Sequence, residues 1–517
     1  MTLNMPYLLA GALVLAACGD SSGTTATDGH GGSTGSTGTT DPPTTGATGS
    51  SSGDATGGSG SITGTTGDTT TDATTDVTMT ASTGVSATSG DTTDATSGGT
   101  GGTTGGVDDL PTSCLDVDFP VDAPLCGSGG PACALKRDEV VSPNPKFRND
   151  MPAIALRGDC GPAVLYSEAV GGYHGFYAER TGPDAWTAEA TPMDVATGSL
   201  EHDPGADEAI AMVDDGAFGS TLWRRVAGAW KKISGLAGMN HNRAPQLVRD
   251  KDGKLHLGHI DSDQTALYDM FDGTWTTKEL DKQADIHVRL ALDAAVQPHL
   301  TYWSSKEATW KLYYAAPPAA PETVTPLNSN VLERAATSLA LAGPDDTPWV
   351  LVARKQQDQQ HHDLVLLHRA GPAKWAEELV AAEDPVADKT CEGEPGGPGQ
   401  TCDYDYVVLF PLALVATASG EVRAIYDAIN FKGTMISQCM PMPFPICVWV
   451  PQSDMSTAEV RVAWPGSKPQ EHEVVAADVF TDRATARLDP GGNIHLAFYD
   501  QAPGTADPIV RYLAFGP

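Results

Sequence analysis

APQLVRDKDGKLHLGHID, residues 244–261, is the stretch of this chain that decides its fold. It contains an apolar segment, a turn rich in Asp and Gly, and a second apolar segment that opens at His256. Apolar and polar residues alternate along both segments, which predicts two short antiparallel strands joined by a tight turn. ALYDMFDGTWTTKEL, residues 266–280, continues with a third strand and a fourth that opens at Trp275. One such unit is therefore expected to form a four-stranded sheet.

The same unit recurs about every 40 to 50 residues, which is the spacing of propeller blades. A single sheet cannot bury both of its faces in water, so similar sheets pack around an axis until the ring closes. We therefore expect an all-β protein, a β-propeller of seven four-stranded blades. Six blades are the alternative, because insertions at 384–406 and 439–447 interrupt one copy. The other copies open at 151–168, 207–233, 288–303, 337–353, 410–428 and 484–500.

The ends of the repeat region predict how the ring closes. The last copy ends in VRYLAFGP, residues 510–517, with no fourth strand after it. ALKRDEVV, residues 134–141, stands alone before the first copy. A strand from the N-terminal side would complete the last blade and fasten the ring. We expect a propeller domain over 110–517, closed by a strand near 134–141.

The first 109 residues have a different character. The apolar run in MTLNMPYLLAGALVLAAC, residues 1–18, is too short to span a bilayer but suits a signal peptide. Its end, LAAC, resembles the lipobox of bacterial lipoproteins, which implies that 1–17 is removed and that Cys18 receives lipid. Residues 18–109 consist mainly of Ser, Thr, Gly, Ala and Asp with no aromatic side chain, so we expect a disordered linker. The resemblance predicts an exported lipoprotein, anchored in the membrane through Cys18, at the outer membrane or cell surface.

Charge limits the choice of partners. The chain has a net charge of -34, and acidic residues predominate in the linker and in the repeat region alike. Such a surface argues against binding to nucleic acid. We expect a monomer without a cofactor, whose ligand is an extracellular glycan or protein.

Cysteine usage agrees with export. Apart from Cys18 there are eight cysteines, an even number that suits disulfides in an oxidising compartment. No Cys-x-x-Cys or Cys/His cluster has zinc spacing, so no metal site is expected. Short loops favour two pairs, Cys391 with Cys402 and Cys439 with Cys447. The remaining four are then expected to pair among themselves: Cys114, Cys126, Cys133 and Cys160.

Residues that recur at one position of the repeat are best explained by architecture. His256, His299 and His495 each open the second strand of a copy, where a ring nitrogen can bond to a neighbouring loop. Tryptophans that open fourth strands are expected to pack between blades: Trp186, Trp230, Trp275 and Trp375.

Positions just ahead of the first strands are the candidate ligand site, because in a propeller these connections reach the mouth of the central channel. Guanidinium groups match carboxylate and sulfate groups bidentately, so arginines converging there would bind anions. The alternative is that these arginines pair with Asp and Glu of neighbouring blades. The candidates are Arg148, Arg243, Arg289, Arg334 and Arg483, joined by His241 and His287.

The repeats resemble a family of extracellular bacterial propellers that is loosely related to the sialidase-like superfamily. In NRAPQLVRDKDGKLH, Arg243 resembles the arginine with which sialidases grip a sugar carboxylate. The chain departs from sialidases in lacking the Ser-x-Asp-x-Gly-x-x-Trp box. We therefore favour a non-catalytic binding module over the alternative, a hydrolase or lyase acting on acidic sugars. A lyase would need a base beside an arginine, for which the candidates are His241, His287, Tyr302 and Tyr404.

Overall fold

The computed structural model describes part of the chain, and everything below concerns these residues. They are 110–114, 121–143, 151–168, 174–195, 197–203, 205–214, 219–237, 245–305, 310–324, 337–355, 361–383, 391–392, 399–440, 446–481, 483–501 and 508–517. Cys18 and the rest of the expected signal peptide and linker lie outside them.

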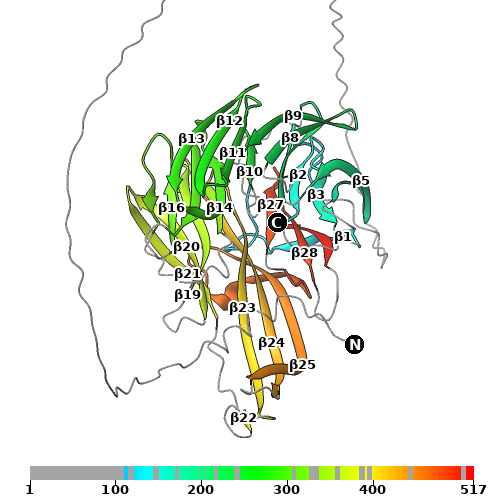
Figure 1. Ribbon diagram of the computed structural model, residues 1–517, viewed down its shortest axis with the longest axis vertical. Coiled ribbons are helices and arrows are strands. Elements are labelled where there is room, and N and C mark those ends of the chain that lie inside the picture. The colour runs from blue at the N-terminus through cyan, green and yellow to red at the C-terminus, as the bar shows by residue number, and fades with distance from the viewer. Residues whose placement is uncertain are drawn as a thin grey trace, which may run out of the picture. The chain divides into compact units, whose positions relative to one another are not determined.

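Seven antiparallel sheets stand around a central axis, and together they form a seven-bladed β-propeller (Figure 1). In each blade the first strand lies innermost, beside the first strands of the two neighbouring blades. These contacts run through all seven blades and return to the start, so the ring is closed. The described residues contain no α-helix, and none of them forms a helix able to cross a membrane. Seven blades, rather than the alternative six, are therefore correct.

The strands follow in chain order from the channel outwards. Blade 1 has β2 (Ala153–Leu156), β3 (Pro162–Glu168), β4 (His174–Gly182) and β5 (Ala185–Asp194). Blade 2 has β6 (Thr197–Asp203), β7 (Glu208–Asp214), β8 (Gly219–Val226) and β9 (Ala229–Ala237). Blade 3 has β10 (Gln246–Arg249), β11 (Leu255–Ile260), β12 (Thr265–Phe271) and β13 (Trp275–Lys282). Blade 4 has β14 (Ala284–Leu292), β15 (Pro298–Ser304), β16 (Lys311–Ala315) and β17 (Glu322–Thr323).

Blade 5 has β18 (Thr337–Ala342), β19 (Thr347–Lys355), β20 (His362–Gly371) and β21 (Lys374–Ala382). Blade 6 has β23 (Thr401–Ala416), β24 (Val422–Met440), β25 (Ile446–Ala463) and β26 (Glu473–Ala477), with β22 (Cys391–Glu392) added beside β23. A short 3-10 turn, Pro469–Glu471, precedes β26. Blade 7 has β27 (Ala484–Leu488), β28 (Ile494–Asp500), β29 (Ile509–Gly516) and, as its outermost strand, β1 (Ala134–Ser142).

The last blade is completed by the N-terminal strand. β1 pairs antiparallel with β29, so the two ends of the domain share one sheet. Arg511 of β29 fastens this pair, because its guanidinium donates to both carboxylate oxygens of Asp138 on β1 at 2.6 Å and to Asp500 on β28 at 2.6 Å. Closure thus combines a backbone ladder with a guanidinium shared between two carboxylates.

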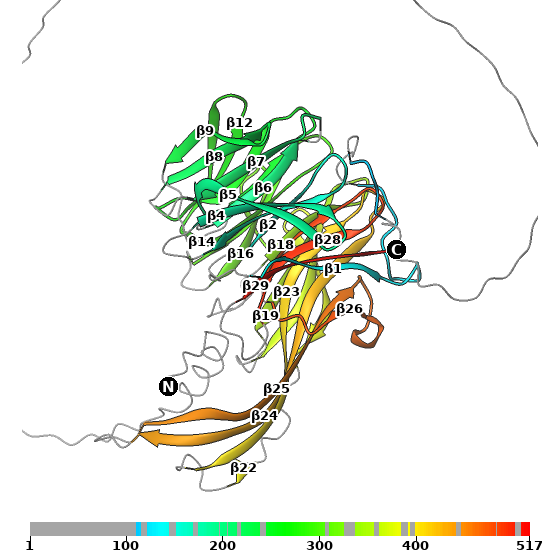
Figure 2. The same ribbon diagram turned by 90° about the vertical axis from the view of Figure 1, so that its right-hand side faces the viewer.

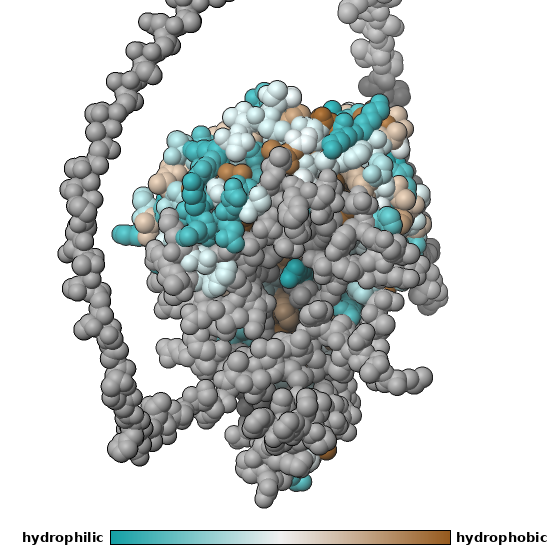
Figure 3. Space-filling view, in the orientation of Figure 1, coloured by the Kyte–Doolittle hydropathy of each residue, from teal (hydrophilic) through white to brown (hydrophobic). Residues whose placement is uncertain are grey.

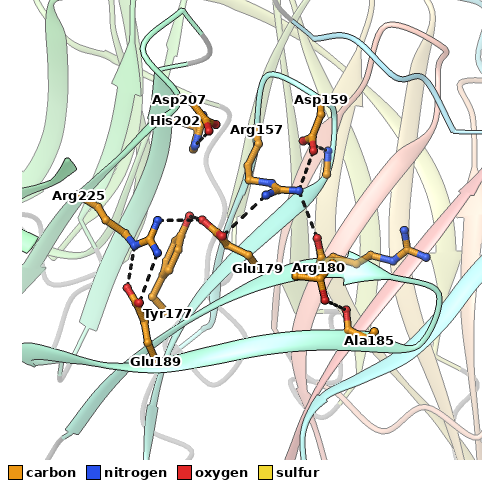
Figure 4. A network of polar contacts seen from close by, with 12 residues as sticks. Arg157, Asp159, Tyr177, Glu179, Arg180, Ala185, Glu189, His202, Asp207 and Arg225 are labelled. Atoms are coloured by element: carbon orange, nitrogen blue, oxygen red, sulfur yellow. Dashed lines mark hydrogen bonds and ion pairs between the residues drawn. The ribbon is translucent and has the colours of Figure 1, made fainter. Parts of the chain in front are cut away.

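An arginine, a glutamate and two aromatic residues recur between neighbouring blades. Between blades 1 and 2, the Arg225 guanidinium donates to Glu189 at 2.7 Å and lies 5.0 Å from the centre of the Tyr177 ring (Figure 4). Trp230 packs edge-on against the same tyrosine and donates to the same glutamate. The arrangement repeats with Glu139, Arg180, Trp186 and Tyr512 and with Glu322, Arg369, Trp375 and Tyr314. The tryptophans that open fourth strands therefore pack between blades, as their repetition predicts.

The repeated histidines are architectural. In blade 3, His256 contacts Asp250 at 3.0 Å through one ring nitrogen and the Tyr268 hydroxyl at 2.6 Å through the other. Asp250 also accepts two backbone N–H groups of the turn between the first two strands. The histidine thus ties this turn to the third strand and leaves no ring nitrogen for a ligand. The other two sets are Asp293, His299 and Tyr314, and Asp489, His495 and Tyr512.

Blade 6 differs from the others because its inner three strands continue beyond the ring (Figure 2). Part of the expected insertion at 384–406 and part of the one at 439–447 therefore form long paired strands instead of loops. Cys391 on β22 forms a disulfide with Cys402 on β23, and the other disulfides are Cys114–Cys160 and Cys126–Cys133. β24 and β25 place Cys439 directly opposite Cys447, although their side chains lie outside the description. The disulfides indicate an oxidising compartment outside the cytoplasm.

A buried histidine in blade 6 should make stability depend on pH. His472 contacts the Tyr426 hydroxyl at 2.7 Å, and burial, together with the positive charge of Arg461, lowers the pKa of His472 to about 4. Between its unfolded pKa of roughly 6.5 and the folded value, only the unfolded chain takes up the proton. We therefore expect the urea midpoint to fall as pH decreases through this window. In His472→Asn, whose amide can still bond to Tyr426, the fall should be smaller; parallel curves for the two proteins would contradict the assignment.

Candidate functional site

Two of the five candidate arginines, Arg289 and Arg483, are described in full. Arg289 lies in β14 of blade 4, and Arg483 directly precedes β27 of blade 7. His287 also lies in β14, but its side chain is not described. The remaining candidates lie outside the described residues: Arg148, Arg243, Arg334 and His241. The structure therefore describes the candidate site only around Arg289 and Arg483.

Arg289 is held by backbone groups. Its Nε donates to the Thr337 carbonyl of blade 5 at 2.8 Å, and one terminal nitrogen lies 3.5 Å from the Val288 carbonyl. Val288 and Leu290 point to the opposite face of β14, where they pack in the core shared with blade 3. The alternation of side chains along β14 therefore directs Arg289 away from that core. The hydrogen bond from Nε to the Thr337 carbonyl holds its guanidinium in place.

The backbone at Arg483 is held by the preceding turn. The Thr481 hydroxyl donates to the Arg483 carbonyl at 2.8 Å, and the Thr481 N–H donates to the buried Asp427 of blade 6 at 2.9 Å. Arg483 is half-buried at the start of the innermost strand of its blade. Its position is therefore set by its own turn and by the neighbouring blade, and no hydrogen bond of its guanidinium to another described residue is found.

Arg289 and Arg483 belong to blades 4 and 7, which are not neighbours in the ring. Blades 5 and 6 separate blade 4 from blade 7 on one side of the ring, and blades 1 to 3 separate them on the other. Burial and the positive charge of Arg483 nevertheless lower the pKa of Arg289 to about 10. Since the two residues are not on neighbouring blades, this repulsion acts through the channel. In Figure 3 hydrophilic residues are common on the described part of the surface.

Among the described residues, no carboxylate pairs with the guanidinium of Arg289 or of Arg483. The alternative expectation, pairing with carboxylates of the blades, fits many other arginines instead. In Figure 4, for example, Arg157 and Arg225 both lie against acidic side chains. The other described arginines paired with Asp or Glu are Arg180, Arg224, Arg249, Arg354, Arg369, Arg423, Arg461, Arg487 and Arg511. Two cations that repel each other in a strongly acidic protein form a site suited to an anion.

Further along the channel the charges are compensated. Arg487 of blade 7 reaches past blade 1 and donates to Glu201 of blade 2 at 2.6 Å. Arg249 pairs with Asp203 at 3.1 Å and also acts on Glu201. Arg487 follows Arg483 by four residues, so it lies about 13 Å further along the strand direction. Within the described part of the channel, the positive charge without a carboxylate partner therefore lies at the end where the first strands begin.

The tyrosines expected as candidate bases are poorly placed for that role. Tyr302 is fully buried in β15, and its hydroxyl donates to Asp281 at 3.4 Å. Burial and the charge of Asp281 raise the pKa of Tyr302, which opposes formation of the phenolate. Tyr404 is buried on the extension of β23. The expectation that Tyr302 could act as a base is therefore wrong, because a base must reach its substrate and lose its proton.

A separate pocket lies at the opposite ends of the blade 1 strands, where Pro111 approaches two hairpin turns. Its arginines are engaged, Arg157 with Asp159 and Arg180 with Glu139. No group of three or more His, Cys, Asp or Glu side chains in the described part of the chain could hold a metal ion. The arginine pair in the channel is thus the stronger candidate for an anionic ligand.

The chain matches no known family model and no curated protein. Among solved structures it is similar to the polysaccharide lyase Uly1, with 9% identity over 73% of this chain and 90% of that one, at a TM-score of 0.39. A copper-containing fungal alcohol oxidase gives 10% identity, coverage of 73% and 76%, and a TM-score of 0.39. The BP39L lectin from Burkholderia pseudomallei gives 11%, coverage of 68% and 96%, and 0.38. Such distant likenesses indicate neither a ligand nor a reaction for this chain.

Proposed function

We propose that this protein is an exported binding module that holds carboxylate- or sulfate-bearing glycans at the mouth of its central channel, with Arg289 and Arg483 as the cationic contacts. The observation that carries the proposal is the placement of Arg289 and Arg483 on the first strands of blades 4 and 7 or directly before them, with no carboxylate paired to either among the described residues. Arg289 and Arg483 are both half-buried, and a bound anion would offset the cost of partly burying two like charges.

Serine hydroxyl groups on the first strands favour a sugar acid as the ligand, and one of them, Ser338, follows Thr337, whose carbonyl accepts from Arg289. Ser199 and Ser338 lie on first strands, and each hydroxyl oxygen accepts a backbone N–H from the next first strand along the ring, at 3.0 and 2.9 Å. Each hydroxyl keeps its own hydrogen, which can be donated to a ligand oxygen. A site that combines guanidinium and hydroxyl donors suits a ligand with an anionic group and many oxygens.

Display outside the cytoplasm belongs to the same proposal. The disulfides of the domain agree with export. Lipid on Cys18 would anchor the protein, and residues 18–109 would act as a flexible tether with a span on the order of 50 Å. A tether of that reach would hold the channel mouth clear of the membrane, where glycans of other cells or of a matrix can enter it.

Arg483→Gln should weaken binding of acidic glycans about 10- to 100-fold, because one charge-assisted hydrogen bond is lost. The test is a glycan array of polyuronates, sulfated glycans, sialosides and neutral glycans, followed by titration at two salt concentrations. Wild-type binding should weaken as salt increases. The substitution should leave the melting temperature unchanged or higher, since it removes the repulsion with Arg289.

Arg224→Gln is the matched control, because it removes the same charge from the partly exposed Arg224 of β8, which lies 3.5 Å from Glu208. We expect it to leave glycan binding unchanged. Equal binding of neutral and acidic glycans, or full binding by Arg483→Gln, would disprove the proposal. Shortened glycan products would instead favour the hydrolase or lyase alternative.

A further inference from the structure

The extension of blade 6 has one polar and one aromatic face. We define the arm as the three paired segments 401–407, 430–440 and 446–457, which project beyond the ring (Figure 2). On one face, Lys432 pairs with Asp405 at 2.9 Å, and Thr434 donates to Asp403 at 2.8 Å. Side chains directly opposite each other in an antiparallel pair share a face, so this face is polar along both strands.

Rings occupy the other face. Tyr406 lies opposite Phe431, and the two rings stack with their centres 5.4 Å apart. The Tyr404 ring is 5.9 Å from that of Tyr406. Tyr406 and Phe431 are both half-buried, so part of each ring is exposed. Among the described side chains of the arm, the aromatic rings therefore share one side, on which Tyr406 and Phe431 are partly exposed.

The aromatic face leads to the channel mouth. Towards the ring it continues into Phe410 and Phe431, which pack against Ile429, Ala458 and Phe480. Phe480 lies three residues before Arg483, and its N–H donates to Asp500 at 3.0 Å. β23 also lies directly beside β27, whose start carries Arg483. From the partly exposed Tyr406 to Phe410 the face is about 13 Å long, and it ends near the turn that carries Arg483.

We infer that the aromatic face of the arm binds the sugar rings that flank the charged residue of an acidic glycan chain. The inference rests on the proposed function. The face of a pyranose ring that carries C–H groups is apolar and can cover an aromatic ring, while its hydroxyl groups remain in water at the edge. The arginines would hold one anionic sugar, and Tyr406 and Phe431 would hold its neighbours along the arm. The ligand is thus a chain of several sugars rather than a single acidic sugar.

The test compares acidic oligosaccharides of two, four and six sugars by calorimetric titration. For the wild type, affinity should increase about 10-fold or more from the disaccharide to the hexasaccharide. In Tyr406→Leu and Phe431→Leu, which keep an apolar side chain but remove the ring, the increase should shrink to within about 2-fold. Disaccharide affinity should stay unchanged, because the arginines are intact. Tyr406→Phe should retain the wild-type dependence on length.

Lys432→Gln on the polar face is the control for charge and for folding of the arm, and its dependence on length should equal that of the wild type. If disaccharide binding depends on Arg483 but the length dependence survives Tyr406→Leu and Phe431→Leu, the inference about the arm is wrong and the proposed function stands. If no acidic oligosaccharide binds the wild type, the proposed function itself fails. Loss of disaccharide binding in the arm variants would also contradict a separate contact for the neighbouring sugars.

Discussion

A chain that begins at Pro143, and so lacks β1, is expected to lose cooperative folding. β29 would lose its partner strand, Arg511 would lose Asp138, and Arg180 would lose Glu139. Breaking a buried ion pair alone costs about 3–5 kcal/mol, and the backbone pairing and buried contacts of β1 are lost as well. The total approaches or exceeds the roughly 5–15 kcal/mol by which domains are stable. Circular dichroism during heating should show no sharp transition.

Two further chains show whether closure is the cause. A chain that begins at Leu110 should melt like the full-length protein, since it keeps every described contact of β1. A peptide of residues 121–142, added to the shortened chain, should restore a transition by filling the place of β1. A sharp transition at the wild-type temperature without the peptide would mean that the ring does not depend on its N-terminal strand.

Glu139→Ala is expected to destabilise the domain by about 3–5 kcal/mol. Glu139 is 3% exposed and lies on β1, where it accepts from Arg180 at 3.0 Å and from the Trp186 indole at 2.9 Å. Arg180 is itself buried, so removal of the carboxylate leaves a buried cation without this partner. Denaturation with urea should show the loss as a lower midpoint with an unchanged slope.

The equivalent glutamate of another blade serves as the comparison. Glu322 holds Arg369 at 2.8 Å in the same arrangement, but the arginine side chain is 30% exposed. Because water can replace the lost carboxylate there, Glu322→Ala should cost about 1 kcal/mol. Equal losses in the two variants would contradict the view that burial decides the strength of these contacts.

The fold could be predicted because several blades repeat the same set of local contacts. The Asp turn, the histidine after it and the tyrosine of the third strand bond to one another, so Asp489, His495 and Tyr512 leave a recurring pattern in the sequence. Closure could be inferred from the missing fourth strand after β29. The arm could not, because its long strands occur only once and carry no repeat. Their pairing depends on β23, β24 and β25 extending together.

The site could be predicted only in part. The sequence predicted that Arg289 and Arg483 lie ahead of first strands; this is correct for Arg483, but Arg289 lies inside β14, which begins at Ala284. The sequence also did not predict the ion pair between Arg487 and Glu201. These residues belong to blades 7 and 2, which are not neighbours in the ring. The alternation of Tyr404 and Tyr406 on one face was a usable signal for the arm. The sequence did not show that Phe431 of β24 lies opposite Tyr406 of β23, which extends the aromatic face across two strands.

The most direct test of the arginine pair is a double-mutant cycle on the affinity for one acidic disaccharide, with Arg289→Gln, Arg483→Gln and the double variant. If both guanidinium groups grip the same anionic group, the single losses should add up to more than the loss in the double variant, by about 1 kcal/mol or more. Additive losses would place the arginines in separate contacts. Affinities equal to that of the wild type in all three variants would contradict the account of the channel mouth as the binding site.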